Sequence, residues 1–385
     1  MLQFPGTVRS KLPNAGISIF SRMTALAHQH NAINLAQGFP DFPSSEKLIE
    51  LVNHYMHQGM NQYAPMPGVM QLREAIAEKT EEIYSIKPDP ETEITIVPGA
   101  TYGLYSTFQA LLHEGDEVIV FEPAYDSYVP GITMAGGVPV LIQLQAPDYK
   151  INWELVKKRI NVHTRAIVLN SPQNPSGTVL KPNDLLQLAK LVKDTDIIII
   201  SDEVYEHIIF DGVRHEGVLH YPELAKRSVI ISSFGKTFHN TGWKIGYVIA
   251  TKELTKEIRA VHQFMQFSVH TPSQYALADF LKDKHQYTML PEFYQQKRDQ
   301  FINLLQGSRF KWKPAAGTYF QLLDYSAISN KKDTDFANEL TEKHKVASIP
   351  LSPFYHNYSQ GNMLRFCFAK SDATLEKAAA ILQKI

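Results

Sequence analysis

Two strand-like segments of the chain end in residues that can do nucleophilic and acid–base chemistry. Lys236 follows the apolar run SVIISSF (228–234), and Asp202 follows DIIIIS (196–201), with Tyr205 three residues later. In an open α/β sheet, ligands bind beyond the carboxyl ends of the strands. We therefore expect an amine, a carboxylate and a phenol to meet at one edge of one sheet.

The same edge is expected to hold an anion. The strand-like EITIV (93–97) leads into Pro98-Gly99-Ala100-Thr101 and then into a helical pattern, which places a helix N-terminus there. Unpaired N–H groups and the positive end of the helix dipole suit a phosphate. Ser233 and Lys244 add a hydroxyl and a cation, and the turn-rich loop SPQNPSGT (171–178) adds the amide of Asn174.

Each of these residues also has an ordinary interpretation. Asn174 can belong to a plain turn, Asp202 or Thr101 can cap a helix, and Lys236 can be a solvated surface lysine. Together, however, they supply what pyridoxal phosphate requires: an amine for the aldehyde, a carboxylate for the pyridine nitrogen, polar groups for the ring oxygen, and a phosphate site. The lysine must also lose its proton, and burial and nearby cations lower its pKa.

The elements that position these residues alternate along the chain. Short apolar runs rich in β-branched residues lie at 93–97, 117–121, 138–144, 166–170, 196–201, 228–234 and 247–250, and helical patterns lie between them at 101–113, 152–160 and 183–194. Strands that are apolar on both faces and spaced by helices predict an α/β fold: a seven-stranded, mostly parallel sheet covered by helices.

The C-terminal part of the chain has a different character. Strands are expected at 318–325, 346–351 and 363–369, and helices at 333–344 and 373–385, the second capped by Ser371 or Asp372. The first 45 residues show no strand rhythm and are expected to pack on this part. The predicted organisation is a large α/β domain at 46–281 and a smaller, discontinuous α+β domain made of 1–45 and 282–385.

Composition excludes several classes of protein. Lys and Arg total 38 against 39 Asp and Glu, a balance that argues against nucleic-acid and membrane partners. Apolar runs are only strand-sized, and the single cysteine, Cys367, excludes a disulfide framework and a Cys-based zinc site. P-loop, GxGxxG, zincin and GxSxG motifs are absent, and no metal site is expected. A reducing, cytoplasmic location is expected.

Longer motifs then place the candidate residues in a family. SDEVYEH (201–207), NSPQNPSGT (170–178) and SSFGKTFHNTGWKIGY (232–247) resemble the class I and II aminotransferases of the aspartate-aminotransferase fold. The likeness extends through INLAQGFPDF (33–42), NQYAPMPG (61–68), FEPAYDSY (121–128) and MLRFCFAK (363–370). Within the family the chain most resembles the branch of methionine and kynurenine–glutamine aminotransferases. The resemblance implies fold type I, pyridoxal 5'-phosphate, and a homodimer with active sites at the subunit interface.

The resemblance also assigns roles to cofactor-binding positions. Lys236 resembles the Schiff-base lysine and Asp202 the partner of the pyridine nitrogen, while Tyr205 and Asn174 resemble ligands of the ring oxygen. The phosphate binders are expected to be Ala100, Thr101, Ser233 and Lys244. Many relatives have Arg at the position of Lys244, so here the charge is kept and the planar fork is lost. Tyr125 resembles the aromatic that stacks on the ring, and Tyr63 a residue that reaches the neighbouring subunit's phosphate.

Several residues are candidates for binding the substrate. The sequence pattern itself indicates one of them, Arg365, and the resemblance indicates the others. An arginine such as Arg365 inside an apolar strand pattern is costly unless paired, and its fork fits a carboxylate. By resemblance Arg365 clamps the substrate carboxylate with support from Gly38 and Asn174; the alternative is a structural ion pair. Cys367 is expected on the same strand face. The side-chain pocket is expected to be lined by Phe20, Phe39, Tyr63, Tyr125 and Phe267, for which core packing is the alternative.

The expected reaction is ping-pong transfer of the amino group of methionine and other large uncharged or aromatic amino acids to a 2-oxo acid. No second arginine is evident for a dicarboxylic substrate, and Ser268 stands where some kynurenine-processing relatives have an imidazole. Kynurenine–oxoglutarate or glutamine aminotransferase and cysteine-S-conjugate β-lyase activities remain alternatives. Outside enzymes, the alternative is a non-catalytic regulatory module that binds pyridoxal phosphate.

Overall fold

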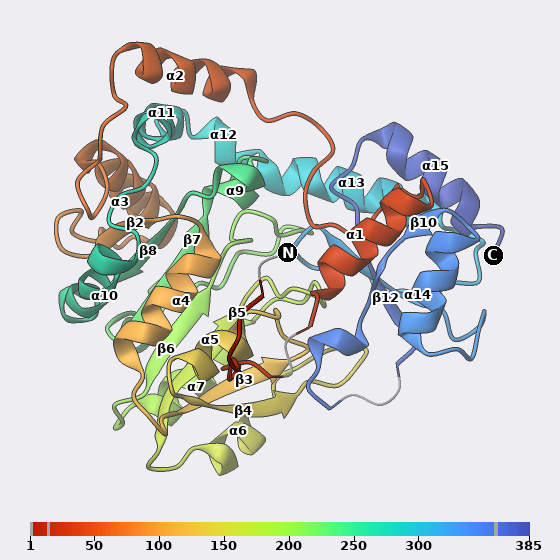
Figure 1. Cartoon of the computed structure of the whole chain (residues 1–385), viewed down its shortest axis with the longest axis horizontal. Coiled ribbons are helices and arrows are strands. Elements are labelled where there is room, and N and C mark those ends of the chain that lie inside the picture. Colours follow the sequence, from red (N-terminus) through yellow and green to blue (C-terminus); the bar gives the residue numbers. More distant parts are fainter. Residues whose placement is uncertain (1–2, 14–15, 358–360) are drawn as a thin grey trace.

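A seven-stranded sheet forms the centre of the molecule (Figure 1). The computed structural model describes residues 3–13, 16–357 and 361–385. The strands of this sheet are β2 (Ile94–Val97), β3 (Glu117–Glu122), β4 (Val138–Gln143), β5 (Thr164–Asn170), β6 (Ile198–Asp202), β7 (Ser228–Ser233) and β8 (Gly246–Ala250). Their order is β2-β8-β7-β6-β5-β3-β4, and only β8 runs antiparallel to its neighbours β2 and β7. The predicted α/β fold is confirmed.

Both faces of the sheet are buried because its strands are apolar throughout. In β6, Ile198 and Ile200 belong to one core and Ile199 to the other, as the two-residue repeat of a strand requires. The first core is closed by α4 (Ala100–Leu111), α5 (Tyr128–Met134) and α10 (Lys252–Met265). The opposite core is closed by α3 (Met70–Tyr84), α6 (Trp153–Arg159), α7 (Pro182–Val192) and α11 (Thr271–Leu281).

The chain between residues 46 and 288 forms further helices. They are α2 (Glu46–His57), which packs on α11, α8 (Pro222–Ala225), α9 (Phe234–Thr237), α12 (His285–Thr288) and the 3-10 turns Val218–His220 and Thr241–Trp243. α9 is a single turn that directly continues β7. It therefore fixes the residues that follow the carboxyl end of a central strand.

The remaining strands form two small sheets beside the large one (Figure 1). β9 (Phe320–Asp324), β12 (Met363–Cys367) and β11 (Ile349–Pro350) form an antiparallel sheet, and β1 (Ile33–Asn34) pairs in parallel with β10 (Val346–Ala347). The helices here are α1 (Ile19–Gln29), α13 (Leu290–Leu304), α14 (Asp333–Glu342), α15 (Asp372–Leu382) and the 3-10 turn Ser352–Phe354. Ser371 caps α15 by accepting a hydrogen bond from the Thr374 amide.

Two details differ from the prediction for this part. The first 45 residues do contain a strand, β1, which is only two residues long and so leaves no alternating pattern in the sequence. The segment 346–351 is two short strands, because the chain pairs with β1 at Val346 and then with β12 at Ile349. α1 packs against α14 and β10, so the N-terminal segment does join the C-terminal elements.

In the part of the chain that the structure describes, no helix is long and apolar enough to cross a membrane.

Candidate active site

A cavity of about 280 Å³ lies where β5, β6 and β7 end and α4 begins. The predicted residues that line it are Phe20, Gly38, Ala100, Thr101, Tyr125, Asn174, Asp202, Tyr205, Ser233, Lys236, Lys244 and Arg365. They come from segments far apart in the sequence. The sheet edge, the N-terminal segment and β12 thus build one site.

Lys236 reaches this cavity from α9. Its Nζ donates hydrogen bonds to the phenol oxygen of Tyr319 at 3.1 Å and to the carbonyl of Gly38 at 3.4 Å, and it lies 5.7 Å from the ring centre of Tyr205. Removal from bulk water lowers the pKa of Lys236 to about 8, and the positive charge of Arg365 acts in the same direction. The amine is therefore neutral, and nucleophilic, at a much lower pH than a surface lysine.

Asp202 is the last residue of β6 and is almost completely buried. The phenol of Tyr128 donates a hydrogen bond to its Oδ2 at 2.6 Å. Burial raises the pKa of Asp202 to about 6, although the Tyr128 hydrogen bond opposes the rise. A carboxylate that is poorly solvated in this way is stabilised by any cationic group that enters the cavity beside it.

The loop after β5 is held against Asp202. Asn170, which pairs with Asp202 in the register of β5 and β6, donates from Nδ2 to the Asp202 carbonyl at 3.1 Å. Its Oδ1 accepts from the Asn174 amide at 2.8 Å. This turn directs Asn174 into the cavity, where its Oδ1 accepts a hydrogen bond of 2.6 Å from Nη1 of Arg365.

The start of α4 brings together the predicted phosphate-binding residues Thr101 and Lys244. Gly99 caps the helix with a φ of 86°, and a Cβ at this position would lie 3.3 Å from Nζ of Lys244, so that ammonium sits beside the helix start. Gly246 packs against the same helix start, because a Cβ there would lie 3.3 Å from the Ala100 amide nitrogen and 2.5 Å from the Ser232 carbonyl oxygen. Thr101 adds a hydroxyl 3.2 Å from the phenol of Tyr125. The Thr101 hydroxyl, the amides of α4 and the Lys244 ammonium suit a phosphate.

Arg365 forms the other end of the cavity and is 1% exposed. Besides Asn174, it donates to the Ala36 carbonyl at 3.1 Å, and its guanidinium lies 3.8 Å from the ring centre of Phe320. Its Nε is buried with no hydrogen-bond partner among the described residues. Burial lowers the pKa of Arg365 to about 10, and its hydrogen-bond acceptors are neutral. A buried cation held by neutral groups is a strong site for a carboxylate.

Three predicted residues do not line the cavity. Tyr63 is 84% exposed and packs edge-on against Phe267, whose side chain is also well exposed. Phe39 is not part of the lining, and its ring lies 4.7 Å from Nζ of Lys370. Within one chain, none of the three contributes to a side-chain pocket.

Several other residues of the site were not predicted from the sequence. Tyr128, Asn170, Phe320 and Gln37 line the cavity, and Tyr319 contacts Lys236. Asn170 had a signal, because it is the last residue of a predicted strand, next to Asp202 in a parallel sheet. The aromatic residues had none, since a tyrosine or phenylalanine in an apolar segment is typical of a core.

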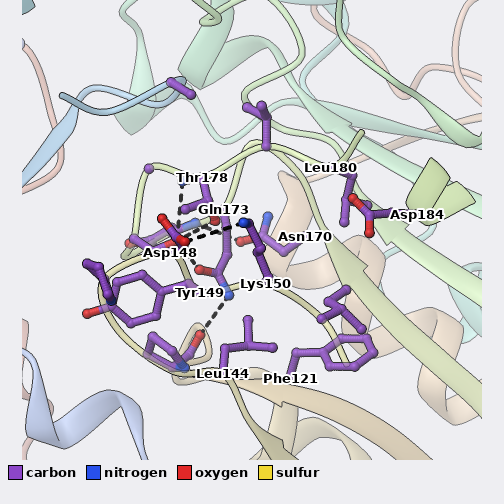
Figure 2. A pocket seen from close by; sticks show the side chains of 18 of the residues that line it. Phe121, Leu144, Asp148, Tyr149, Lys150, Asn170, Gln173, Thr178, Leu180 and Asp184 are labelled. Atoms are coloured by element: carbon purple, nitrogen blue, oxygen red, sulfur yellow. Dashed lines mark hydrogen bonds and ion pairs between the residues drawn. The ribbon is translucent and has the colours of Figure 1, made fainter. Parts of the chain in front are cut away.

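A larger cavity, of about 1000 Å³, shares Tyr128, Asn170 and Asn174 with the smaller one. It is enclosed by the segments 144–154, 168–187 and 311–316, and Figure 2 shows part of its lining. Its charged groups include Asp148, which binds Lys313 at 2.5 Å and Lys150 at 3.3 Å. Lys236, Asp202 and Arg365 do not line this cavity, so the smaller one is the candidate active site.

The family follows from comparison with known proteins. The family model described as aminotransferase class I and II matches residues 30–382. The chain belongs to this family. The methionine aminotransferase of Escherichia coli (strain K12) is 48% identical over 386 residues, with 100% of both chains covered. Human kynurenine–oxoglutarate transaminase 1 is 33% identical, with 93% of each chain covered.

Solved structures of aminotransferases match the fold closely. YbdL from Escherichia coli, described as having a methionine aminotransferase function, superposes with a TM-score of 0.97 over 99% of this chain and 100% of that one, at 48% identity. The N-succinyldiaminopimelate aminotransferase of Mycobacterium tuberculosis gives 0.94 over 98% and 100%, at 34% identity.

Aminotransferases of this family and fold use pyridoxal 5'-phosphate, and the residues of the cavity fit it. A nucleophilic lysine, a buried carboxylate and a helix N-terminus with a cation match the aldehyde, the pyridine nitrogen and the phosphate. The buried guanidinium of Arg365 lies at the other end of the same cavity.

Proposed function

We propose that this aminotransferase takes methionine, and more generally large uncharged or aromatic amino acids, as amino donors for 2-oxo acids in a ping-pong reaction. The proposal rests mainly on the position of Arg365. Its guanidinium is buried at one end of the cavity and donates hydrogen bonds to neutral groups. Around it lie Phe20 and Phe354, each 5.2 Å from the guanidinium carbon. A carboxylate site enclosed by aromatic rings suits an amino acid with an apolar side chain. The 48% identity to the Escherichia coli methionine aminotransferase supports methionine among these.

The cavity residues divide the chemistry among them. When bound, pyridoxal phosphate supplies an electron sink for the charge that develops at the substrate α-carbon. Asp202 would keep the pyridine nitrogen protonated, and Tyr205 and Asn174 would hold the ring oxygen. Lys236 would hold the aldehyde carbon, and its Nζ would serve as the base for the α-proton of the substrate.

The other residues bind and orient the two ligands. The amides of Ala100 and Thr101, with Ser233 and Lys244, would hold the phosphate, and Tyr125 would pack against the ring. Arg365 binds the substrate carboxylate with the backbone of Gly38 beside it, and Phe20 contacts the side chain. Holding both ligands at fixed ends of one cavity places the α-carbon near Nζ of Lys236.

The enzyme is further proposed to act as a cytoplasmic homodimer in which Tyr63 completes the partner's phosphate site. Exposed apolar side chains gather at the end of α10, namely Phe264, Met265 and Phe267, with Tyr63 in ring contact with Phe267. Exposed apolar clusters of this kind mark interfaces. In such a dimer, Tyr63 and Phe267 act across the interface, and Phe39 borders the entrance.

Two domains are proposed with the boundaries expected above, 46–281 and the pair 1–45 with 282–385. The packing of α1 on α14 and the pairing of β1 with β10 support this division. The cavity draws Asp202 and Lys236 from the first unit and Gly38 and Arg365 from the second. Relative movement of the two units would open and close the site.

A screen of amino donors against 2-oxo acids tests the specificity. Methionine is expected to give the highest kcat/KM, followed by phenylalanine and glutamine, and aspartate the lowest. Kynurenine ahead of methionine would favour the activity of the human relative named above. Release of pyruvate and ammonia from cystathionine without a 2-oxo acid would indicate a β-lyase, and yellow protein that no amino acid bleaches would indicate a binding module.

A further inference from the structure

Tyr319 contacts the reacting amine from a segment that lies far from the sheet edge in sequence. It is fully buried just before β9, and its hydroxyl donates a hydrogen bond to the Gly38 carbonyl at 2.6 Å. The phenol oxygen lies 3.1 Å from Nζ of Lys236. The Tyr205 phenol also interacts with this hydroxyl. With the hydroxyl proton directed to Gly38 at 2.6 Å, the oxygen accepts from Lys236.

The backbone is strained where it presents this side chain. Thr318, which precedes Tyr319, has a φ of 65°, a left-handed conformation that β-branched residues rarely adopt. Its amide donates to the Ile208 carbonyl at 2.9 Å, which holds the conformation. Strain of this kind is retained mainly where it serves a site.

The contacts define the orientation of the amine. A neutral lysine has two N–H bonds and one lone pair. Nζ of Lys236 donates toward Tyr319 and toward Gly38, so both N–H bonds are engaged on one side. The lone pair then occupies the remaining tetrahedral position, away from these two acceptors.

We propose that Tyr319 is a positioning residue for transamination, which orients the lone pair of Lys236 so that this amine can take the α-proton of the substrate. The inference rests on the role proposed for Lys236. It also gives the two proposed units a common element, because Tyr319 joins Gly38 and Lys236 through one hydroxyl group.

The chain offers a matched control in Tyr294. This tyrosine is also fully buried, and its ring centre lies 5.9 Å from that of Tyr319. Its hydroxyl, however, binds Nδ1 of His239 at 2.8 Å, and Tyr294 does not line the cavity. Tyr294→Phe therefore removes an equivalent buried hydroxyl without touching Lys236.

The test compares Tyr319→Phe, Tyr319→His and Tyr294→Phe in the holoenzyme with methionine as donor. Tyr319→Phe is expected to lower kcat by about 10- to 100-fold with KM changed less than threefold, because misorientation affects the proton transfer and not binding. Tyr319→His offers a ring nitrogen as acceptor and should retain more activity. Tyr294→Phe should stay within threefold of wild type.

A second measurement uses the cofactor-free chain. The rate at which acetic anhydride acylates Lys236 is followed against pH by peptide mass spectrometry. A hydrogen-bond acceptor favours the ammonium form, so Tyr319→Phe should lower the midpoint by at least about 0.5 pH unit and Tyr294→Phe should leave it unchanged. The other groups that act on Lys236, namely Cys367, Arg365, Lys244 and Asp202, are the same in both variants.

The results distinguish the role of Tyr319 from the role of Lys236. An unchanged acylation midpoint in Tyr319→Phe, equal losses of kcat in the two phenylalanine variants, or failure of both Tyr319 variants to fold while Tyr294→Phe folds would overturn the role of Tyr319. If the acylation midpoint shifts but wild-type Lys236 proves dispensable for turnover, the contact stands and the role proposed for Lys236 fails.

Discussion

Tyr128 donates a 2.6 Å hydrogen bond to the carboxylate of Asp202, at the point where the central strand β6 ends. The two residues lie 74 positions apart, and both are buried. This bond partly compensates for the loss of solvation that raises the pKa of Asp202 to about 6. It therefore favours the charged form of the residue proposed to hold the pyridine nitrogen.

Tyr128→Phe should weaken cofactor binding. Without the hydrogen bond the pKa of Asp202 rises further, so more of the carboxyl is protonated near neutral pH and the cofactor Kd at pH 7 should increase about tenfold. When the cofactor affinity is measured between pH 5.5 and 8.5, the decrease in affinity on the acidic side should occur at a higher pH in the variant than in wild type. Tyr102→Phe is the control, because that phenol binds His262 and not Asp202. If the affinity decreased at the same pH in both variants, the expectation would be contradicted.

Asp202→Asn should separate stability from function. The carboxyl has a pKa of about 6 in the folded chain and about 3.9 when unfolded, so the folded chain binds more protons between these values. The free energy of unfolding of the cofactor-free wild type therefore falls as pH rises through this window, by roughly 3 kcal/mol for this group. The variant lacks that penalty. Its melting temperature should exceed that of wild type at pH 8 and match it at pH 4, while transamination is lost; a constant difference across pH would show another cause.

Lys236→Ala should abolish transamination and the yellow colour of the cofactor bonded to lysine. Lys256→Ala, which changes an exposed lysine, should alter neither. In wild type, the rate of cofactor uptake should rise with pH to a midpoint near 8, since burial lowers the pKa of Lys236 to about 8 and only the neutral amine attacks. A midpoint above 10, or a yellow alanine variant, would disprove the assignment.

Arg365→Lys should raise the KM for methionine by about 100-fold while leaving the cofactor bound. The lysine keeps the charge but loses the planar fork that a carboxylate binds with two hydrogen bonds. The informative control is 3-(methylthio)propylamine, which has the side chain and amine of methionine without the carboxylate. Its slow reaction should be equal in wild type and variant, and an equal loss for both compounds would assign Arg365 a structural role.

Mixing two inactive variants tests the dimer. Lys236→Ala lacks the amine, and Tyr63→Ala lacks the side chain proposed to reach the partner's phosphate. In a mixed dimer, one site combines the intact Lys236 with the partner's intact Tyr63, so activity should recover to at most one site in two. Tyr63 that served its own subunit would give no recovery. Size-exclusion chromatography at the assay concentration provides the oligomeric state.

The large sheet and the residues at its carboxyl edge can be predicted from the amino-acid sequence. A run of β-branched residues predicts each strand. The residue that follows a strand lies at the edge of the sheet, and this does not depend on how the other segments pack. This is why Lys236, Asp202 and Asn174 were found from local pattern alone. The strand β1 was not predicted, because two residues are too few to show an alternating pattern.

The side chains that contact those residues depend on how distant segments pack, which the local sequence does not show. Asn170 faces Asp202 because β5 lies next to β6 in the sheet, and Tyr128 reaches the same carboxylate from the start of α5. Tyr319 meets Lys236 because the strained turn at Thr318 brings a distant segment over the sheet edge. A buried phenol in an apolar segment has the same local sequence signal whether it fills a core or holds a reacting amine. The distinction arises from packing between segments far apart in the chain, and that information is not local.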